Sequence, residues 1–410
     1  MRRSLLTRVI AGLCVGGLMS FAPARADDAP AADVTAVGQS TQAVAASFYA
    51  QYKDREGNLC LSPYALSLAL GTVHAGAHGA TQAELTKALG LTLPAERVAA
   101  AQSALAKAVT ATANGTTRDL KTQLALWTQV PPGDAFAAVG KDQYGAVITP
   151  TDFAADPTAA RTAINTAIGE ETGGAVTDIV RPGMLREHTR LVTYAGLSFR
   201  ADWENGFVVS EISDAYFLVT PTRAAPVKMM NKTDTFLYAE TDEAQIVSLP
   251  FKDGKQSLII ILPPDARKLQ AIEGSLSAEK LQQWQGALKK EMVHISLPRF
   301  SLHTARDVAI PLEGLGLKTV FDREAADFSG IAGAPGEMAL GPVLHRAAIT
   351  VDERGEVQSV SAATHLLMGN SGNNRNTKRL NADHPFLFVL RDDGTGAILL
   401  IGRLVDPAKQ

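Results

Sequence analysis

The sequence predicts a single α+β domain, with helices gathered early in the chain and strands gathered later. Two observations lead to this prediction. Apolar residues recur at helical spacing through the first third, and short strand-like runs bounded by Gly, Pro or Asp follow. No internal repeat and no Gly/Ser linker divides the 410 residues. The composition, 46% hydrophobic and 20% charged, is typical of a globular protein and excludes a disordered or collagen-like chain.

Four segments carry a helical pattern. In the first three, the apolar residues that recur at helical spacing are Val44, Phe48 and Tyr52, then Leu66, Leu70 and Val73, then Leu85, Ala88 and Leu89. Ser62-Pro63 favours a helix start, because Ser caps free backbone N–H groups and Pro fits the first turn. A fourth helix is expected over residues 157–172, with Pro157 near its first turn.

Eight short runs rich in β-branched and aromatic residues are typical of strands. They cover residues 124–127, 190–199, 245–250, 257–262, 293–297, 347–351, 386–390 and 398–403.

The first 26 residues have the three-part layout of a secretory signal. Three arginines precede an apolar run over residues 9–24, and residues 24–26 (Ala-Arg-Ala) form a small-x-small cleavage site. The run is too short and too rich in glycine for a membrane anchor. Leu13 before Cys14 disfavours a lipoprotein signal. We therefore expect cleavage after Ala26 and a secreted or periplasmic protein of residues 27–410.

Charge and cysteine content narrow the function classes. The formal charge is -3, and removal of residues 1–26 takes away four arginines and no acid, which leaves -7. Such an acidic chain lacks the basic excess of a nucleic-acid binder. Cys60 would be the one remaining cysteine, so no intrachain disulfide is expected and the hydrophobic core must hold the fold.

Residues 355–384 have no clear helical or strand period, which is unusual within a compact domain. Residues 369–376 are rich in Asn and Gly and predict an exposed turn that proteases would attack. Residues 357–364 carry no charge, Pro or Gly, so this part could pair as a strand beside an open sheet edge.

Several blocks, in a fixed order over nearly all of residues 27–410, resemble the serpin family. Trp203 with Phe207 is similar to the tryptophan block of the family. The other blocks are Asn58-Leu-Cys-Leu-Ser-Pro63, Gly76-Ala-His-Gly-Ala-Thr81, Ala326-Asp-Phe-Ser-Gly-Ile331, His345-Arg-Ala-Ala-Ile-Thr-Val-Asp-Glu-Arg-Gly355 and Ala382-Asp-His-Pro-Phe-Leu-Phe388. This many blocks in the family's order make the resemblance specific.

The resemblance implies the serpin fold, with three β-sheets, eight or nine helices and an exposed reactive-centre loop at about residues 355–380. In inhibitory members a protease attacks this loop, and the cleaved loop enters the central sheet and carries the acyl-enzyme with it. The resemblance therefore implies a suicide-substrate inhibitor of a serine protease, with a cysteine protease as the less favoured target. It implies a monomer that is not an enzyme and has no cofactor, metal site, nucleic-acid partner or membrane attachment.

By the same resemblance, the hinge of the reactive loop comprises Glu353, Gly355, Glu356, Val357, Gln358, Ser359, Val360, Ser361 and Ala362. After insertion, alternate residues from Glu356 onward would face the core. Inhibitory relatives usually have Thr or Ser in place of Glu356, followed by small residues. Burial of an unpaired carboxylate costs several kcal/mol. The alternative hypothesis is therefore a non-inhibitory serpin, which is a protease substrate or a peptide- or ligand-binding module.

The resemblance also assigns a hydrogen-bonded shutter beneath the sheet to Ser62, Ala65, Ala195 and His345, and places Trp203 at the top of the sheet. Only Ser62 and His345 keep the polar residue type of the family.

Two candidate scissile positions remain open. Arg375-Asn376 suits a trypsin-like protease, and Met368-Gly369 a chymotrypsin- or elastase-like one. We favour Arg375, because a single cationic side chain among asparagines is a specific recognition feature for a protease.

Three other constellations are weak. His74 and His78 have helical spacing, but no third metal ligand is evident. Asp383-His384 lacks a Gly-x-Ser-x-Gly elbow elsewhere in the chain, which disfavours a hydrolase. The basic residues at positions 375, 378 and 379 are most simply a solvated loop.

Overall fold

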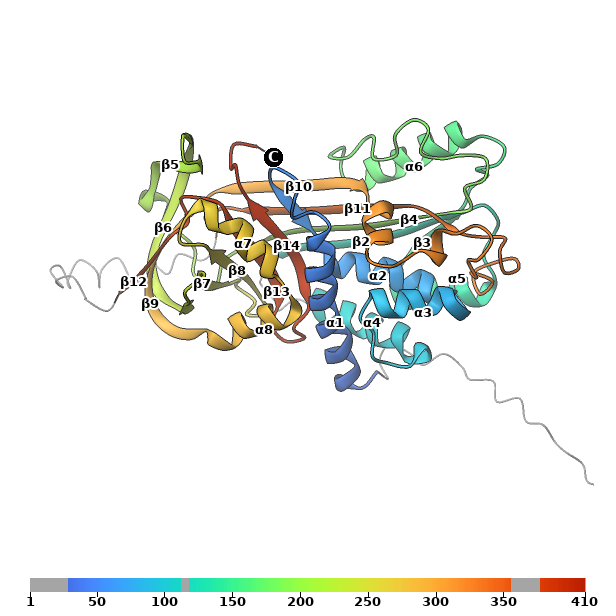
Figure 1. Cartoon of the computed structure of the whole chain (residues 1–410), viewed down its shortest axis with the longest axis horizontal. Helices are drawn as coiled ribbons and strands as arrows, with labels where there is room; N and C mark the ends of the chain where they lie inside the picture. Colours follow the sequence, from blue (N-terminus) through green and yellow to red (C-terminus); the bar gives the residue numbers. More distant parts are fainter. Residues whose placement is uncertain (1–28, 112–117, 355–376, 410) are drawn as a thin grey trace, which may run out of the picture.

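The computed structural model describes residues 29–111, 118–354 and 377–409. Its central layer is a five-stranded sheet of order β10-β11-β4-β2-β3, which runs horizontally through the molecule in Figure 1. The strands are β10 (Phe300–Asp307), β11 (Leu340–Val351), β4 (Leu191–Ala201), β2 (Arg118–Thr128) and β3 (Val147–Pro150).

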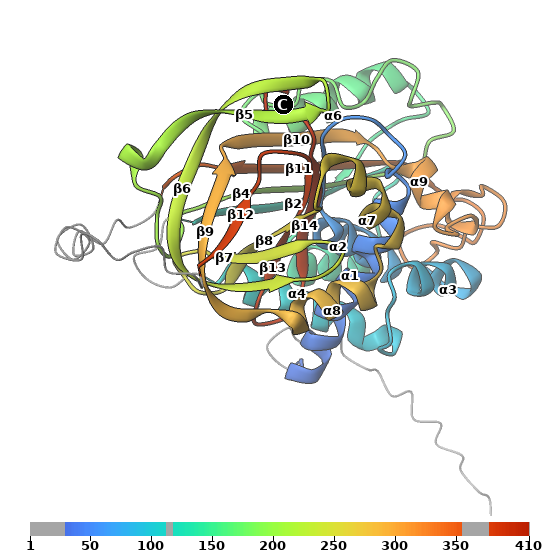
Figure 2. The ribbon, with the colours of Figure 1, turned by 60° about the vertical axis from the view of Figure 1, so that its left-hand side comes forward.

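A second, nine-stranded sheet has the order β1-β14-β13-β8-β7-β6-β9-β12, and β5 also pairs with β6. The strands are β1 (Leu59–Leu61), β5 (Ile212–Thr220), β6 (Arg223–Glu240), β7 (Gln245–Pro250), β8 (Gln256–Leu262), β9 (Lys289–Pro298), β12 (Lys378–Asn381), β13 (Phe386–Asp392) and β14 (Ile398–Leu404). The 18-residue β6 pairs with β5 at its beginning, with β9 in the middle and with β7 at its end. The described strands thus form two hydrogen-bonded sheets where three were expected, because β6 pairs with β5, β9 and β7 in turn (Figure 2).

Nine α-helices lie in the described ranges. They are α1 (Ala31–Ala50), α2 (Pro63–His74), α3 (Gly79–Ala88), α4 (Ala95–Thr110), α5 (Asp134–Tyr144), α6 (Pro157–Glu171), α7 (Leu269–Ser275), α8 (Ala278–Ala287) and α9 (Ala309–Gly314). No helix among these is long and apolar enough to cross a bilayer.

Local sequence explains where two of the helices begin. The Ser62 hydroxyl accepts a hydrogen bond from the Ala65 N–H and Pro63 occupies the first turn, as predicted. The Asp156 carboxylate caps α6 in the same way, accepting from the N–H groups of Thr158 and Ala159. Every residue of α2 is buried, because this helix contacts β14 of one sheet and β2 and β4 of the other.

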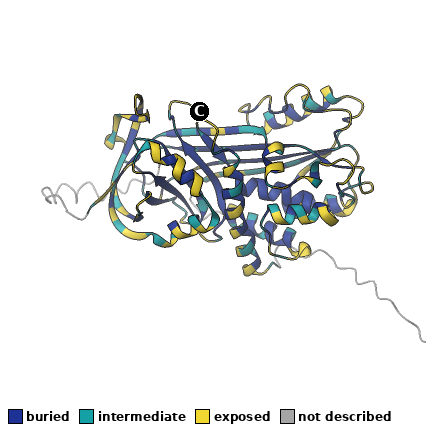
Figure 3. Cartoon of the chain, viewed as in Figure 1, coloured by how far each residue is buried: buried dark blue, intermediate teal, exposed yellow. Residues whose placement is uncertain are grey.

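The main hydrophobic core lies between the two sheets and around α2, and β8, β13 and β14 are buried along almost their whole length (Figure 3). A separate apolar cluster fills the space between α6 and the opposite face of the five-stranded sheet. It includes Trp127, Ile164, Ile168, Tyr194 and Leu344. The five-stranded sheet is therefore covered on both faces.

The α+β class is confirmed, and all eight predicted strand runs lie within observed strands apart from the first residue of the run 190–199. The predicted segregation of helices and strands is only partly correct, because α7, α8 and α9 lie among the later strands. These helices are six to ten residues long, which gives too few apolar residues for a clear period. The predicted signal segment, residues 1–26, lies outside the described residues.

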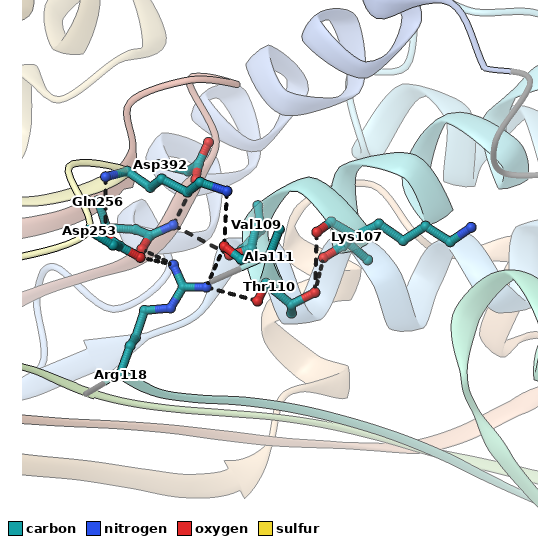
Figure 4. Close-up of polar contacts among 10 residues, drawn as sticks. Lys107, Val109, Thr110, Ala111, Arg118, Asp253, Gln256 and Asp392 are labelled. Carbon is teal, nitrogen blue, oxygen red and sulfur yellow. Dashed lines mark hydrogen bonds and ion pairs between the residues drawn. The ribbon is translucent and has the colours of Figure 1, made fainter. Parts of the chain in front are cut away.

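A buried arginine joins three elements at the beginning of β2 (Figure 4). The Arg118 guanidinium forms an ion pair of 2.6 Å with Asp253 and also donates to the Gln256 side-chain oxygen. Its other terminal nitrogen donates to the carbonyls of Thr110 and Ala111, at the C-terminal end of α4. A cation is favourable there because the helix dipole is negative at that end.

Candidate functional site

The candidate site lies where two parallel strands of the five-stranded sheet meet. β4 and β11 pair in parallel from Leu191↔Leu340 to Phe199↔Ile349, and we call this pairing the seam. On its outer sides β4 pairs antiparallel with β2, and β11 pairs antiparallel with β10. A strand that entered the seam antiparallel to both neighbours would leave these outer ladders intact.

The expected reactive loop connects the two sheets. It follows β11, which ends at Val351 in the five-stranded sheet, and precedes β12, which begins at Lys378 in the nine-stranded sheet. Of the predicted hinge, only Glu353 is described. Gly355, the other hinge residues at positions 356–362 and the four candidate scissile residues Met368, Gly369, Arg375 and Asn376 lie outside the described residues.

Trp203 and Phe207 hold the residues that follow β11. The Trp203 backbone N–H donates to the Arg354 carbonyl at 2.9 Å, and its indole N–H donates to the Asp352 carbonyl at 2.7 Å. The Phe207 N–H donates to the Glu353 carbonyl at 3.1 Å. The indole is buried and stacks on Phe251, with ring centroids 4.5 Å apart. The start of the predicted hinge is therefore tied to the top of the sheet by three hydrogen bonds.

Ion pairs reinforce this attachment. The Glu353 carboxylate pairs with Arg299 at 2.7 Å, and Asp352 pairs with Arg200 at 2.7 Å and with Arg354 at 3.0 Å. Burial raises the pKa of the Asp352 carboxyl, and the nearby guanidinium of Arg200 opposes this rise. The sequence did not reveal these partners, because Arg200 and Asp352 are 152 positions apart and no spacing motif links them.

The four predicted shutter residues do come together beneath the seam. The Ser62 backbone N–H donates to His345 Nε2 at 3.1 Å, while the Ser62 hydroxyl donates to the Leu399 carbonyl at 2.8 Å. Ala195 lies directly opposite His345 across the seam, and the Ala65 N–H donates to the Ser62 hydroxyl. Neither alanine adds a side-chain hydrogen bond.

His345 is a neutral, fully buried imidazole. Complete burial, with a smaller contribution from the charge of Arg306, lowers its pKa to about 3. Because Nε2 accepts from Ser62, the single proton lies on Nδ1, which has no hydrogen-bond partner in the described part of the chain. His345 therefore joins β11 to the start of α2 as a hydrogen-bond acceptor and carries no charge at neutral pH.

The weaker constellations have structural partners. His74 Nε2 contacts the Thr86 hydroxyl at 2.9 Å, and no group of three potential metal ligands occurs within the described ranges. His384 contacts the Asp383 carboxylate through Nδ1 and the Pro263 carbonyl through Nε2, so neither ring nitrogen faces a nucleophile. Burial opposes protonation of His384, but these two hydrogen bonds outweigh burial and raise its pKa.

Comparisons with known proteins agree with this architecture. The family model described as Serpin (serine protease inhibitor) matches residues 39–407. The chain is 30% identical to Serpin B6 of Pongo abelii over 361 residues, which is 87% of this chain and 95% of that protein. It is 30% identical to a leukocyte elastase inhibitor of Bos taurus over 359 residues, 86% and 93% of the two chains.

An uncharacterized serpin-like protein of Thermococcus kodakarensis is 29% identical over 361 residues, 88% of this chain and 83% of that protein. Among solved structures, uncleaved ovalbumin matches with a TM-score of 0.82 and 24% identity, over 91% of this chain and all of ovalbumin. Maspin matches with a TM-score of 0.80 and 26% identity, over 92% of this chain and all of maspin. The family model covers most of the chain and the relatives align over nearly their full length, so this chain belongs to the serpin family.

Proposed function

We propose that this serpin inhibits a serine endopeptidase by acting as a suicide substrate. The protease would cleave within residues 355–376, and the freed segment after β11 would enter the seam. The observation that carries the proposal is the parallel pairing of β4 and β11, which is directly continuous with the expected reactive loop. A segment that folds back from the end of β11 runs antiparallel to both strands and can pair with each of them.

The energetics of insertion single out its first step. Each new backbone hydrogen bond contributes about 0.5–1.5 kcal/mol net. Entry of Glu356 would remove a carboxylate from water at a cost of several kcal/mol, or force its protonation. Trapping competes with deacylation, and each 1.4 kcal/mol or so slows a step about tenfold. The rate of trapping therefore depends on the barrier at the first inserted position more than on the total free energy of insertion. A carboxylate at that position raises this barrier.

The target we propose is a trypsin-like serine protease that cleaves after Arg375. Cleavage at Met368 by a chymotrypsin- or elastase-like enzyme is the second candidate, and a cysteine protease the third. The similarity to leukocyte elastase inhibitors supports a protease as the partner. The family is described as inhibitors of serine proteases, not as enzymes. We propose that the inhibitor is a monomer.

We also propose that the protein is exported, to the periplasm or the medium. The basic start, the apolar run and the small residues at 24–26 support removal of residues 1–26. Mass spectrometry of the exported protein tests this point, since it should show an N-terminus at Asp27. An N-terminus at Met1 in the cell extract alone would contradict export.

A non-inhibitory serpin is the second candidate function. The specific observation in its favour is the pair Glu356 and Gln358, two polar residues at positions that insertion would turn toward the core. In this case the chain would be cleaved as an ordinary substrate, or would use the same scaffold to bind a peptide or another ligand.

Incubation with trypsin-, chymotrypsin-, elastase- and subtilisin-type enzymes tests the proposal. We expect a band on a denaturing gel at the summed mass of inhibitor and protease, and mass spectrometry of the released C-terminal peptide identifies the cleaved bond. Glu356→Thr should increase the share of this complex relative to cleaved serpin, whereas Glu187→Thr, at an exposed loop position, should leave it unchanged. Clean cleavage without the complex, for both the unsubstituted protein and the Glu356→Thr variant, would favour the non-inhibitory candidate.

A further inference from the structure

A polar cavity lies over the seam, on the face of the five-stranded sheet opposite the main core. Its volume is about 460 Å³, and it is bordered by β4, β10, β11 and the segment after α6. Polar and cationic residues dominate its lining, among them Arg200, Arg346, His303, Ser198, Ser301 and Thr350. The cavity spans both strands of the seam, because Ser198 lies opposite Ala348 and Gly196 lies opposite Arg346.

Arg346 is the unusual member of this set. It is only 8% exposed, and its Nε has no hydrogen-bond partner among the described residues. The Tyr194 hydroxyl, which lies near both Arg346 and Glu171, likewise forms no well-directed hydrogen bond in the described part of the chain. Burial of a guanidinium with an unpaired N–H costs folding free energy, unless an anion or another acceptor forms a hydrogen bond with it.

Within the described ranges, no acidic residue that lines the cavity supplies an acceptor for the Arg346 guanidinium. Asp119 is the acidic residue that lines it, but its carboxylate is 59% exposed and pairs with Lys121 at 3.3 Å. Arg200 is shared with Asp352, at the end of β11. Glu171 lies near enough to Arg346 for their charges to interact, but it is not among the residues that line the cavity. The cavity thus presents cationic and hydroxyl donors with little competing negative charge.

We propose that the cavity binds a small oxoanion, of the phosphate class, with Arg346 as the main contact. Planar guanidinium groups bind such anions through paired hydrogen bonds, and the serine and threonine hydroxyls supply further donors. Because the bound anion would contact side chains of both β4 and β11, it would hold the seam closed. The binding and the closure stand on the cavity alone, whereas any effect on protease trapping rests on the proposed function.

Titration calorimetry of the protein with inorganic phosphate tests the binding. We expect one saturable site. Arg346→Met should weaken the affinity for phosphate about tenfold or more, because the variant lacks the charge-assisted hydrogen bonds of the guanidinium. Arg391→Met is the matched control, since Arg391 Nε is also unpartnered among the described residues but lies on β13 of the other sheet. Equal binding by the Arg346 variant and the control, or no saturable site, would overturn the proposal. Phenyl phosphate in place of phosphate distinguishes a phosphorylated small molecule from the free ion.

Amide hydrogen exchange tests the closure separately. Phosphate should slow exchange at least severalfold in residues 191–199 and 340–349, and leave the strands β7 and β8 unaffected. Phosphate also stabilises proteins in general by exclusion from their surface, which would slow exchange in both sheets and in the Arg346 variant alike. That general pattern would contradict a site at the seam. Neither measurement uses a protease, so a failure of the proposed inhibition leaves both results interpretable.

Discussion

Replacement of Arg118 by Met should destabilise the protein by about 3–5 kcal/mol, which is the usual cost of removing one partner of a buried ion pair. The Arg118 and Asp253 side chains are only 2% and 1% exposed, and their charged atoms lie 2.6 Å apart. Without the guanidinium, the Asp253 carboxylate stays buried and uncompensated. The carbonyls of Thr110 and Ala111 lose a donor as well, although Lys255 still donates to Ala111 at 3.0 Å.

Thermal unfolding followed by circular dichroism measures this loss. A chain of this length has an unfolding entropy of about 0.8 kcal/mol per kelvin, so 3–5 kcal/mol corresponds to a fall in Tm of about 4–6 °C. The double variant Arg118→Met/Asp253→Asn should recover part of the loss, because it removes the uncompensated charge. Arg161→Met is the control, since the exposed pair Arg161–Asp178 contributes less than about 1 kcal/mol.

Two results would refute this reasoning. The first is a fall in Tm for Arg118→Met no larger than for Arg161→Met. The second is a double variant whose loss equals the sum of the two single losses, which would mean that Arg118 and Asp253 do not interact.

Three further predictions concern buried groups. His345 has a folded pKa of about 3, below its unfolded value, so unfolding takes up a proton as the pH falls below about 6.5. Protonation of this residue on unfolding should therefore lower the unfolding free energy by about 2 kcal/mol between pH 7 and pH 5. Denaturation of His345→Gln should lack this part of the pH dependence. Cys60 is fully buried, which raises its pKa, so a thiol reagent should modify it only after unfolding; rapid labelling of the folded protein would contradict the packing of β1. Trp203→Phe should lower the unfolding free energy by about 1–2 kcal/mol, because the Asp352 carbonyl loses its donor; an unchanged urea midpoint would count against this hydrogen bond.

Local sequence was sufficient for much of the fold. Ser62 and Pro63 begin α2 and Pro157 begins α6 through contacts within a few residues, which a linear pattern can reveal. The run 245–250 coincides with β7 because its apolar residues are buried on both faces. The serpin resemblance also came from sequence alone, since its blocks keep their order along the chain. It grouped Ser62 with His345, and a hydrogen bond joins these two residues although they are 283 positions apart.

The polar contacts that secure the sheets depended on the tertiary structure. Arg118 meets Asp253 across 135 positions, and Trp203 meets Asp352 across 149. Neither spacing has a local period, because each pair forms only after two sheets or their connections pack together. Arg346 looks like any other charged residue in the sequence, and only burial beside Tyr194 leaves its Nε without a partner among the described residues. Short-range capping, periodicity and the order of the family blocks were thus enough to predict four of the nine helices in the described residues, eight of the strands and the family. Which charges are buried, and with which partners, was settled only by packing, because burial depends on segments that are distant in the chain.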